Sequence, residues 1–238
     1  MGTRCLFWFW EETMEVSKNE SFLRRWEGHI EELINISAKK PQAIEAKHQM
    51  IVEGACRVFF KKGFHPASMR EIAEAAGMSM GQMYHYISSK DDVLFLIHKH
   101  MQTSWYRQLM DARIEETRDP TRKMAFALDS SISFLIENKD LIQFIYSESK
   151  YLSKKHLRVV LEMDDKNVVE YFRGILNDAL EQQGVEADVD LAANLVVYML
   201  VFFPLRGWNM KSRPMKEVLE FITEFIFKGL GLSRSWRE

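Results

Sequence analysis

This 238-residue chain is poor in cysteine, proline and glycine. Its two cysteines, Cys5 and Cys56, cannot build a disulfide framework or a multi-cysteine zinc site. We expect both to be reduced thiols in a cytoplasmic protein, with Cys56 serving as a small core residue. Five prolines and eleven glycines are few for this length, which argues against a turn-rich β-sandwich or barrel. The scarcity of turn residues therefore favours long helices.

Long apolar runs are scarce as well. The segment Cys5–Trp10 is apolar for six residues and is then interrupted by Glu11, so it is too short for the apolar part of a signal peptide. The most apolar stretch, Leu191–Leu205, holds Asn194 and Pro204 and falls short of the ~20 residues that cross a bilayer. We therefore predict a buried helix in this stretch and no membrane partner.

The chain also lacks a large excess of charge of either sign, because its formal net charge is −2. This average hides a contrast along the sequence. Residues 47–90 carry six Lys or Arg against three acids, a net charge of +3, whereas the segments on either side are net acidic. A modestly basic segment in an acidic chain is a candidate for contact with nucleic acid.

What the sequence does contain is helical periodicity along most of its length, without strand-like alternation or internal repeats. We predict an all-α fold in three parts. Residues 1–44 form an N-terminal extension with an amphipathic helix over 20–36, residues 45–92 form a small helical unit, and residues 93–238 form a larger one. The apolar stripe of the extension should dock against the larger unit or a dimer partner, through Phe22, Trp26, Ile30, Leu33 and Ile34.

Capping residues mark where the helices start and stop. Asp119 followed by Pro120 is a cap with a first-turn proline, and Gly63 and Gly184 are placed to end helices. We expect helices over residues 45–62, 69–76, 80–87, 90–110, 120–138, 141–147, 157–184, 188–208 and 214–229.

Residues 68–87 are predicted to form a helix-turn-helix. Ser68 can cap the first short helix, and Glu71 completes a capping box. Gly77 suits the left-handed position of a tight turn, and Ser79 can cap the second helix. That second helix has few core anchors and carries Tyr, His and Gln side chains, which contact phosphates and base edges in DNA-binding proteins. The alternative is a three-helix packing unit with an aromatic surface; the local basic charge favours DNA binding.

The residues that carry this motif also carry a family resemblance. They are Ala55, Phe59, Gly63–Phe64, Ser68–Ala73, Ala76–Ser79, Gly81, Met83–Tyr86 and Ser89–Lys90. Through them, residues 53–94 resemble the DNA-binding domain of the tetracycline-repressor (TetR) family of bacterial transcriptional regulators. The resemblance implies an N-terminal three-helix DNA-binding domain over 45–92 and a C-terminal helical ligand-binding and dimerisation domain over 93–238.

The resemblance further implies which side chains contact double-stranded operator DNA. Arg70 and Gln82, at the exposed starts of the motif helices, would read bases, whereas Tyr84 and Lys90 would bind phosphates. Met80 departs from the Lys or other polar residue of many members, which puts base reading at that position in doubt. The implied contact set is Ser68, Arg70, Ser79, Met80, Gly81, Gln82, Tyr84, His85, Tyr86 and Lys90.

The implied function is that of a repressor that acts as a homodimer and is released from DNA by a small, largely apolar effector. Helices over 190–208 and 214–230 carry more apolar surface than one bundle can cover, so we expect them to pair with their symmetry mates. The effector would shift the protein towards a conformer that no longer fits the operator. Candidate pocket walls are the aromatic residues Phe126, Phe134, Phe144, Tyr146, Tyr151, Phe172, Tyr198 and Trp208.

Acidic and basic side chains form no catalytic constellation in the sequence. His98 and His100 are two residues apart, which places them on different faces of a helix, so we expect no metal pair. The other scattered groups lack a nucleophile partner or a glycine-rich loop, and we expect them to be solvated or capping residues: Glu148, His156, Asp164 and Asp165. The sequence thus predicts no enzymatic activity, no metal and no cofactor.

Two other functions stay open at this point. One is an architectural DNA-binding protein that takes no ligand. The other is a helical interaction module that uses the apolar N-terminal segment. A filled pocket would favour the first, and partner binding that depends on residues 1–44 would favour the second.

Overall fold

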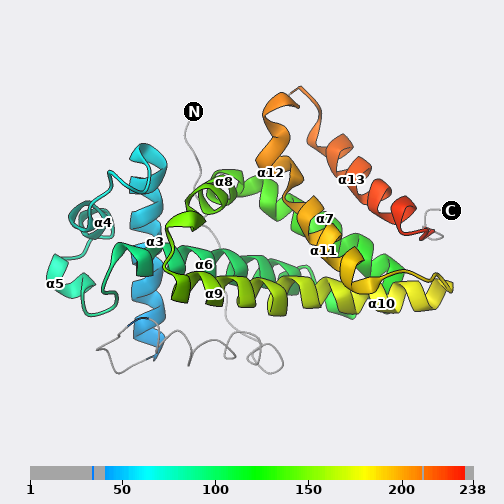
Figure 1. The fold of residues 1–238 in the computed structure, drawn as a ribbon, viewed down its shortest axis with the longest axis horizontal. Helices are drawn as coiled ribbons and strands as arrows, with labels where there is room; N and C mark the ends of the chain where they lie inside the picture. The colour runs from blue at the N-terminus through cyan, green and yellow to red at the C-terminus, as the bar shows by residue number, and fades with distance from the viewer. Residues whose placement is uncertain (1–33, 35–40, 211, 234–238) are drawn as a thin grey trace.

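The computed structural model describes residues 34, 41–210 and 212–233. The described residues form helices and connecting turns without a strand, which confirms the all-α prediction (Figure 1). Helices α3 to α5 lie at one end of an elongated molecule, and α11 and α13 lie towards the opposite end. The predicted N-terminal helix over 20–36 lies outside the described residues, apart from Ile34.

The α-helices are α3 (Pro41–Lys62), α4 (Met69–Ala75), α5 (Met80–Met83), α6 (Lys90–Asp111), α7 (Pro120–Glu137), α8 (Lys139–Glu148), α9 (Lys154–Met163), α10 (Glu170–Gln183), α11 (Val189–Leu200), α12 (Phe202–Arg206) and α13 (Met215–Gly229). Three short 3-10 turns join them, at η1 (Ile114–Glu116), η2 (Ser149–Tyr151) and η4 (Gly207–Asn209). A π-helical segment, η3 (Asp164–Val169), connects α9 to α10.

Local sequence signals set the shape of the helix-turn-helix. Ser68 Oγ accepts the Glu71 N–H at 3.3 Å, and the Glu71 carboxylate accepts the Ser68 N–H at 3.0 Å, so the predicted capping box is confirmed. Gly77 has φ +67° and Gly63 has φ +83°, the left-handed conformations expected after α4 and α3. After the single α-helical turn of α5, the chain continues in tighter turns to Tyr86, so the second motif helix is shorter than predicted.

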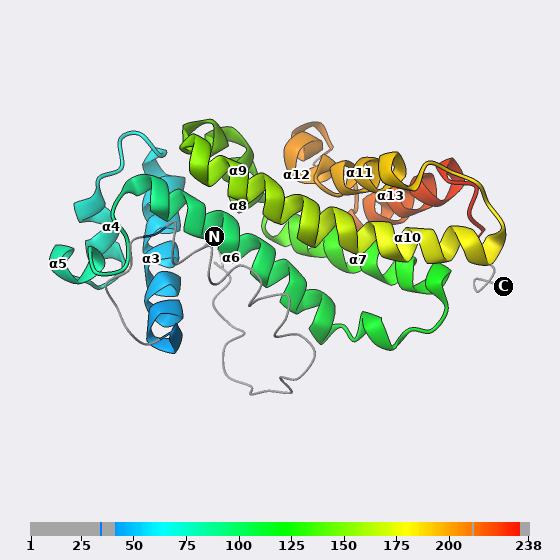
Figure 2. The ribbon, with the colours of Figure 1, turned by 60° about the horizontal axis from the view of Figure 1, so that its bottom comes forward.

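Helix α6 leaves the helix-turn-helix and runs through the middle of the molecule, side by side with α9 (Figures 1 and 2). Segment η3 continues α9 directly into α10, which packs along α7 and ends at Gly184 with φ +66°. The long helix expected over 157–184 therefore exists, with a π-helical segment inside it. Such a segment is rare and changes which side chains share a face.

Two hydrophobic cores hold these helices together. One joins α6, α7, α10, α11 and α13 around fully buried residues such as Leu128 and Phe172. The other joins the helix-turn-helix to α8 and α9, where the Phe59 and Phe144 rings stack 5.2 Å apart. Ile34 is fully buried in this second core, which it shares with residues of the helix-turn-helix. The small N-terminal unit thus shares its core with residues beyond 140.

The apolar stretch Leu191–Leu205 differs from its prediction. Helix α11 ends at Leu200, and the axis bends by 48° into the next helical segment. Because neighbouring helices cover only one side of α11, its other side stays exposed: Leu191 is 58 % exposed, Leu195 55 % and Tyr198 67 %. Within the described residues, no single helix is long and apolar enough to cross a membrane; only the bent pair Val189–Leu200 and Phe202–Asn209 meets that test, by length and composition alone.

Close contact between α3 and α4 depends on Gly54, which yields a stability prediction. A Cβ at Gly54 would lie 2.6 Å from the backbone nitrogen and 2.9 Å from the Cα of Ala76, and backbone atoms cannot move aside cheaply. Gly54→Ala should therefore lower the free energy of unfolding by about 1–3 kcal/mol, measured by urea denaturation. The control is Gly174→Ala in α10, where a Cβ meets nothing within 4 Å. It should be neutral or stabilising by up to ~1 kcal/mol; equal effects of the two would contradict this account.

Candidate DNA-binding surface and ligand cavity

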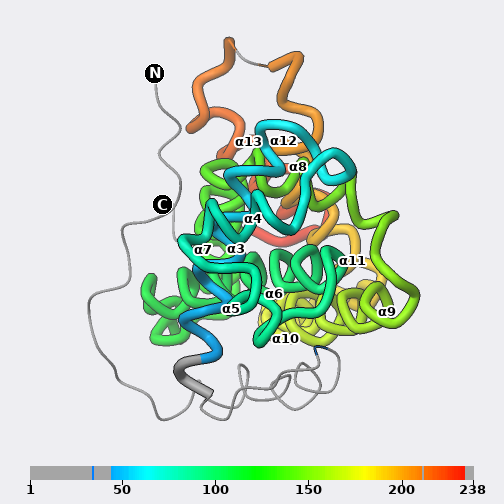
Figure 3. Tube along the Cα trace, turned by 90° about the vertical axis from the view of Figure 1, so that its left-hand side faces the viewer, coloured from blue at the N-terminus to red at the C-terminus, as the bar shows by residue number. Residues whose placement is uncertain are grey.

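The predicted DNA contacts gather on the outer surface of α4 and α5, the end of the molecule that faces the viewer in Figure 3. Seven of them are exposed: Ser68, Arg70, Ser79, Gly81, Gln82, Tyr84 and His85. Met80 and Tyr86 are half-buried and pack against the second core. These exposed contacts therefore offer one cation, the capping hydroxyls of two serines, and the polar aromatic side chains of Tyr84 and His85 just after α5.

The start of α5 is fixed by a second capping box. The Ser79 N–H donates to Gln82 Oε1 at 2.9 Å, and the Gln82 N–H donates to Ser79 Oγ at 3.2 Å. The Gln82 side chain is thus partly engaged, and its amide nitrogen is the atom that can still donate to a base. Gly81 carries no side chain between these residues, so backbone can approach DNA closely there.

Helix α3 supports this surface from below. Arg57 donates to the Ala75 carbonyl at the end of α4, and His48 Nε2 lies 3.2 Å from the Tyr86 carbonyl after α5. Burial lowers the pKa of His48 to about 4, so the ring is neutral near pH 7 and donates this hydrogen bond. Helix α3 therefore contacts the motif on both sides of α5, at the end of α4 before it and at Tyr86 after it.

Lys90 has a different place from the one expected. Its ammonium donates to the carbonyls of Phe64, His65 and Ala67 at 2.8, 3.0 and 3.0 Å, and lies 4.6 Å from the centre of the Phe64 ring. An ammonium has three donors, and all three are used. Lys90 therefore ties the first turn of α6 to the loop between α3 and α4, and in this arrangement its ammonium has no N–H left for a phosphate.

A cavity of about 280 Å³ lies between α6, α8, α9, η3 and α11. Its walls are largely apolar, and the exposed lining residues Tyr146 and Leu161 mark its mouth. The lining consists of His98, Met101, Gln102, Trp105, Leu135, Ile142, Ile145, Tyr146, Ser149, Leu157, Val160, Leu161, Asp164, Val168, Val197, Leu200 and Val201.

Of the eight aromatic residues predicted as pocket walls, this cavity uses only Tyr146. Phe134 and Phe172 are buried in the first core, and Phe144 and Tyr151 pack against the second. The other three lie on the surface: Phe126, Tyr198 and Trp208. The walls come mostly from aliphatic residues instead, and periodicity cannot distinguish these from ordinary core.

Polar groups in the cavity were not expected from the sequence. His98 Nε2 lies 3.2 Å from Ser149 Oγ, and burial lowers the pKa of His98 to about 4, which keeps the ring neutral near pH 7. Gln102 accepts a hydrogen bond from Asn167 at 3.2 Å. Asp164 was expected to be a solvated or capping residue. It follows the last residue of α9 and lines the cavity, and burial followed by the charge of Asp165 raises its pKa to about 6.

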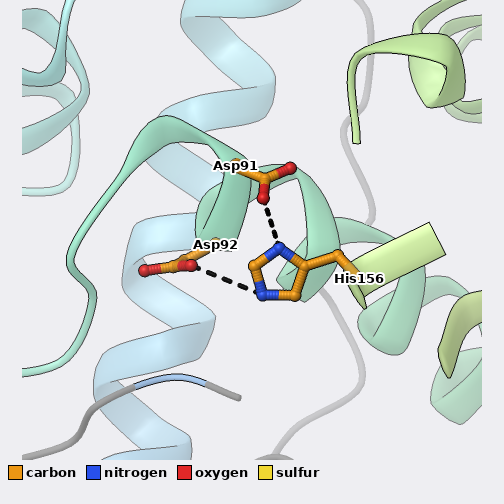
Figure 4. Close-up of side chains that lie close together, drawn as sticks. All are labelled: Asp91, Asp92 and His156. Atoms are coloured by element: carbon orange, nitrogen blue, oxygen red, sulfur yellow. Dashed lines mark hydrogen bonds and ion pairs between the residues drawn. The ribbon is translucent and has the colours of Figure 1, made fainter. Parts of the chain in front are cut away.

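A second polar cluster joins α6 to α9 (Figure 4). His156, also expected to be a solvated or capping residue, is 5 % exposed; its Nδ1 bonds to the Asp91 carboxylate, and its Nε2 lies 3.5 Å from Asp92 Oδ1. The ring stacks on Phe95 at 5.0 Å, and Asp91 also accepts the Ser153 N–H at 3.0 Å. The three groups are close enough to contact one metal ion, but the two ring nitrogens face different carboxylates. The geometry fits a hydrogen-bonded bridge between the helices.

Known proteins match both the sequence of the helix-turn-helix and the overall fold. A family model described as "Bacterial regulatory proteins, tetR family" matches residues 51–97, which run from α3 through the helix-turn-helix into α6. Residues 51–97 therefore match the DNA-binding domain of the TetR family of transcriptional regulators, as the resemblance of residues 53–94 implied. The chain is accordingly a DNA-binding regulator.

Relatives within the TetR family extend the match beyond the DNA-binding domain. The regulator HbdR of Aromatoleum sp. (strain CIB) is 27 % identical over 112 residues, which cover 47 % of this chain and about half, 48 %, of HbdR. The structure of PfmR from Thermus thermophilus superposes with a TM-score of 0.62 at 27 % identity and covers 76 % of this chain and 98 % of PfmR. FadR from Bacillus subtilis in complex with stearoyl-CoA has a TM-score of 0.64 at 21 % identity, covers 75 % of this chain and 96 % of FadR, and shows a shared fold.

The hydrogen bonds of Lys90 generate a prediction that separates a structural role from a phosphate contact. Lys90→Met leaves three carbonyls without their charged donor, so the free energy of unfolding should fall by about 1–3 kcal/mol. The slope of DNA affinity against salt concentration should stay unchanged, since no phosphate contact is removed. Arg70→Met removes an exposed cation from the same surface and should leave stability unchanged. If Lys90→Met has normal stability and its salt slope falls by about one, Lys90 contacts a phosphate and the structural interpretation is wrong.

Proposed function

We propose that this TetR-family regulator represses transcription as a homodimer on operator DNA and that an apolar ligand in the cavity releases it. The observation that carries this proposal is the position of α6. This helix begins with Lys90, a few residues after the recognition segment, by which we mean residues 80–87. Four of its side chains line the cavity: His98, Met101, Gln102 and Trp105. DNA-binding surface and cavity thus share one rigid element.

A second copy of the chain is the partner that fits the exposed apolar side of the molecule. On α11 this side presents Leu191, Leu195 and Tyr198, and on α13 it presents Phe221, 70 % exposed, whose ring stacks 6.2 Å from that of Phe225. So much exposed apolar surface is unusual for a monomer. Pairing of α11 and α13 with the same helices of a second copy covers both faces at once in a two-fold interface.

A dimer also explains how the helix-turn-helix binds an operator. Two recognition segments related by a two-fold axis enter successive major grooves when they lie ~34 Å apart. The operator is then a palindrome, and affinity depends on holding both segments at that spacing. Any change in the angle between the two copies of α6 alters the spacing and weakens binding.

The lining of the cavity favours a ligand with an apolar body. FadR, which shares this fold, has been crystallised with stearoyl-CoA. We extend the class of ligand to this chain, because an acyl group can enter past Tyr146 and Leu161 while its charged nucleotide end stays in solvent. The cavity also argues against an architectural DNA-binding protein, which has no use for such a space. The interaction-module alternative depends on residues outside the described part of the chain.

Dimerisation and palindrome recognition are tested together. Wild-type protein should be dimeric by sedimentation and should select a palindrome from random DNA. Leu195→Glu places a charge in the proposed interface, so the protein should become monomeric and lose about two orders of magnitude in operator affinity. Ala187→Glu adds the same charge in the exposed loop before α11 and should change neither property. A dimeric, fully active Leu195→Glu protein would contradict the interface.

Ligand release is tested on the same complex by titration with acyl-CoA thioesters of increasing chain length. Wild-type protein should leave the operator as the ligand saturates. Leu161→Trp narrows the mouth of the cavity, so it should keep its operator affinity and require a higher thioester concentration. Release that is identical in both proteins would place the effector elsewhere.

A further inference from the structure

The cavity contains one ionisable acid and, among the described residues that line it, neither lysine nor arginine. That acid is Asp164. Within the described part of the chain its carboxyl group has no hydrogen-bond or ion-pair partner, whereas the adjacent Asp165 faces solvent and lies 3.9 Å from Arg173. Among the described residues, therefore, none compensates the charge inside the cavity.

Asp164 lies on the cavity side of α9, at helical spacing from Val160 and Leu161, at the point where an uncommon backbone feature begins. Asp164 is the first residue of the π-helical segment η3, and Val168, four residues later, lines the same cavity. Widened π turns are rare and occur often at functional sites, because they redirect side chains at little cost to the rest of the helix. Here the widened turn is at the wall of the cavity, between α9 and α10.

Electrostatics determine which ligand groups this arrangement accepts. Burial raises the pKa of Asp164 to about 6, so the carboxylate is mostly ionised near pH 7 but poorly solvated. His98 is neutral because burial lowers its pKa to about 4, and Tyr146 is neutral because burial raises its pKa to about 12. An anionic group would be repelled by Asp164 and would meet no lysine or arginine among the described lining residues, whereas a hydroxyl or amine can donate to the carboxylate.

We propose that the cavity selects a ligand whose apolar body carries a hydrogen-bond donor, a hydroxyl or an amine, directed at Asp164, and that it rejects ligands that place an anionic group inside. This inference rests on the proposed ligand-responsive function only for its regulatory consequence, since binding itself is a property of the cavity. It agrees with an acyl thioester whose carbonyl is neutral and whose acyl group bears a donor. It disfavours a free fatty acid that inserts its carboxylate.

The test uses three eight-carbon probes that differ only in their head group: octylamine, 1-octanol and octanoate. Binding to the full chain is measured by titration calorimetry near pH 7.5. Wild-type protein should bind octylamine and 1-octanol at least about tenfold more tightly than octanoate. The two donor probes also separate the sources of the donor, because a preference for octylamine indicates a cationic ligand and a preference for 1-octanol a hydroxylated one.

Asp164→Asn removes the charge and retains the shape, so the difference between octylamine and octanoate should shrink by about tenfold. Asp165→Asn removes the same charge one residue away, outside the cavity lining, and should leave the wild-type order unchanged. The inference is overturned if no probe binds, if octanoate binds as tightly as octylamine, or if both variants behave alike. Melting temperatures show that both variants fold.

The same probes keep this inference apart from the proposed function. Operator release is followed by fluorescence anisotropy with each probe at saturation. If octylamine and 1-octanol bind more tightly than octanoate but do not release the operator, the inferred ligand class is supported and the proposed effector role fails. If acyl-CoA releases the operator but the cavity shows no preference for the donor probes, the effector role is supported and the inferred ligand class fails.

Discussion

The continuity of one helix is the constraint on which the rest of the structure depends. Helix α6 has 22 residues and spans about 33 Å. Its first turn is tied to the loop between α3 and α4 by Lys90 and to α9 by Asp91 and Asp92. Its middle lines the cavity, and Trp105, near its far end, donates to Ser131 at 2.9 Å in the first core. A rigid element fixed at three places cannot shift at one of them alone.

Helix α9 is the element through which a ligand can act on α6. It contributes Leu157, Val160 and Leu161 to the cavity and carries His156 one residue before them. A ligand that moves this wall therefore moves the bridge from His156 to Asp91 and Asp92, at the first turn after the recognition segment. Because the second core joins α8 and α9 to the helix-turn-helix, the displacement reaches the DNA-binding end as a whole rather than as a local bend.

Features fixed by nearby residues could be predicted from the sequence, and features fixed by distant ones could not. The capping box of Ser68 and the left-handed Gly77 depend on neighbours within a few positions, so the helix-turn-helix was located correctly. The carbonyl partners of Lys90 and the carboxylate partners of His156 lie more than twenty residues away, and these roles were missed. The cavity walls are aliphatic side chains at ordinary core spacing, and the π-helical segment that begins at Asp164 has no sequence signal of its own.

The measurement that tests the coupling most directly is the ratio of operator affinities without and with saturating ligand, compared between wild type and His156→Gln. The account predicts that His156→Gln binds the operator and the ligand but that its ratio falls towards one, because α9 no longer pulls on α6. His100→Gln, a substitution of a half-buried histidine on α6 outside the cavity lining, should keep the wild-type ratio. A His156→Gln protein that responds to the ligand as fully as wild type would contradict the account.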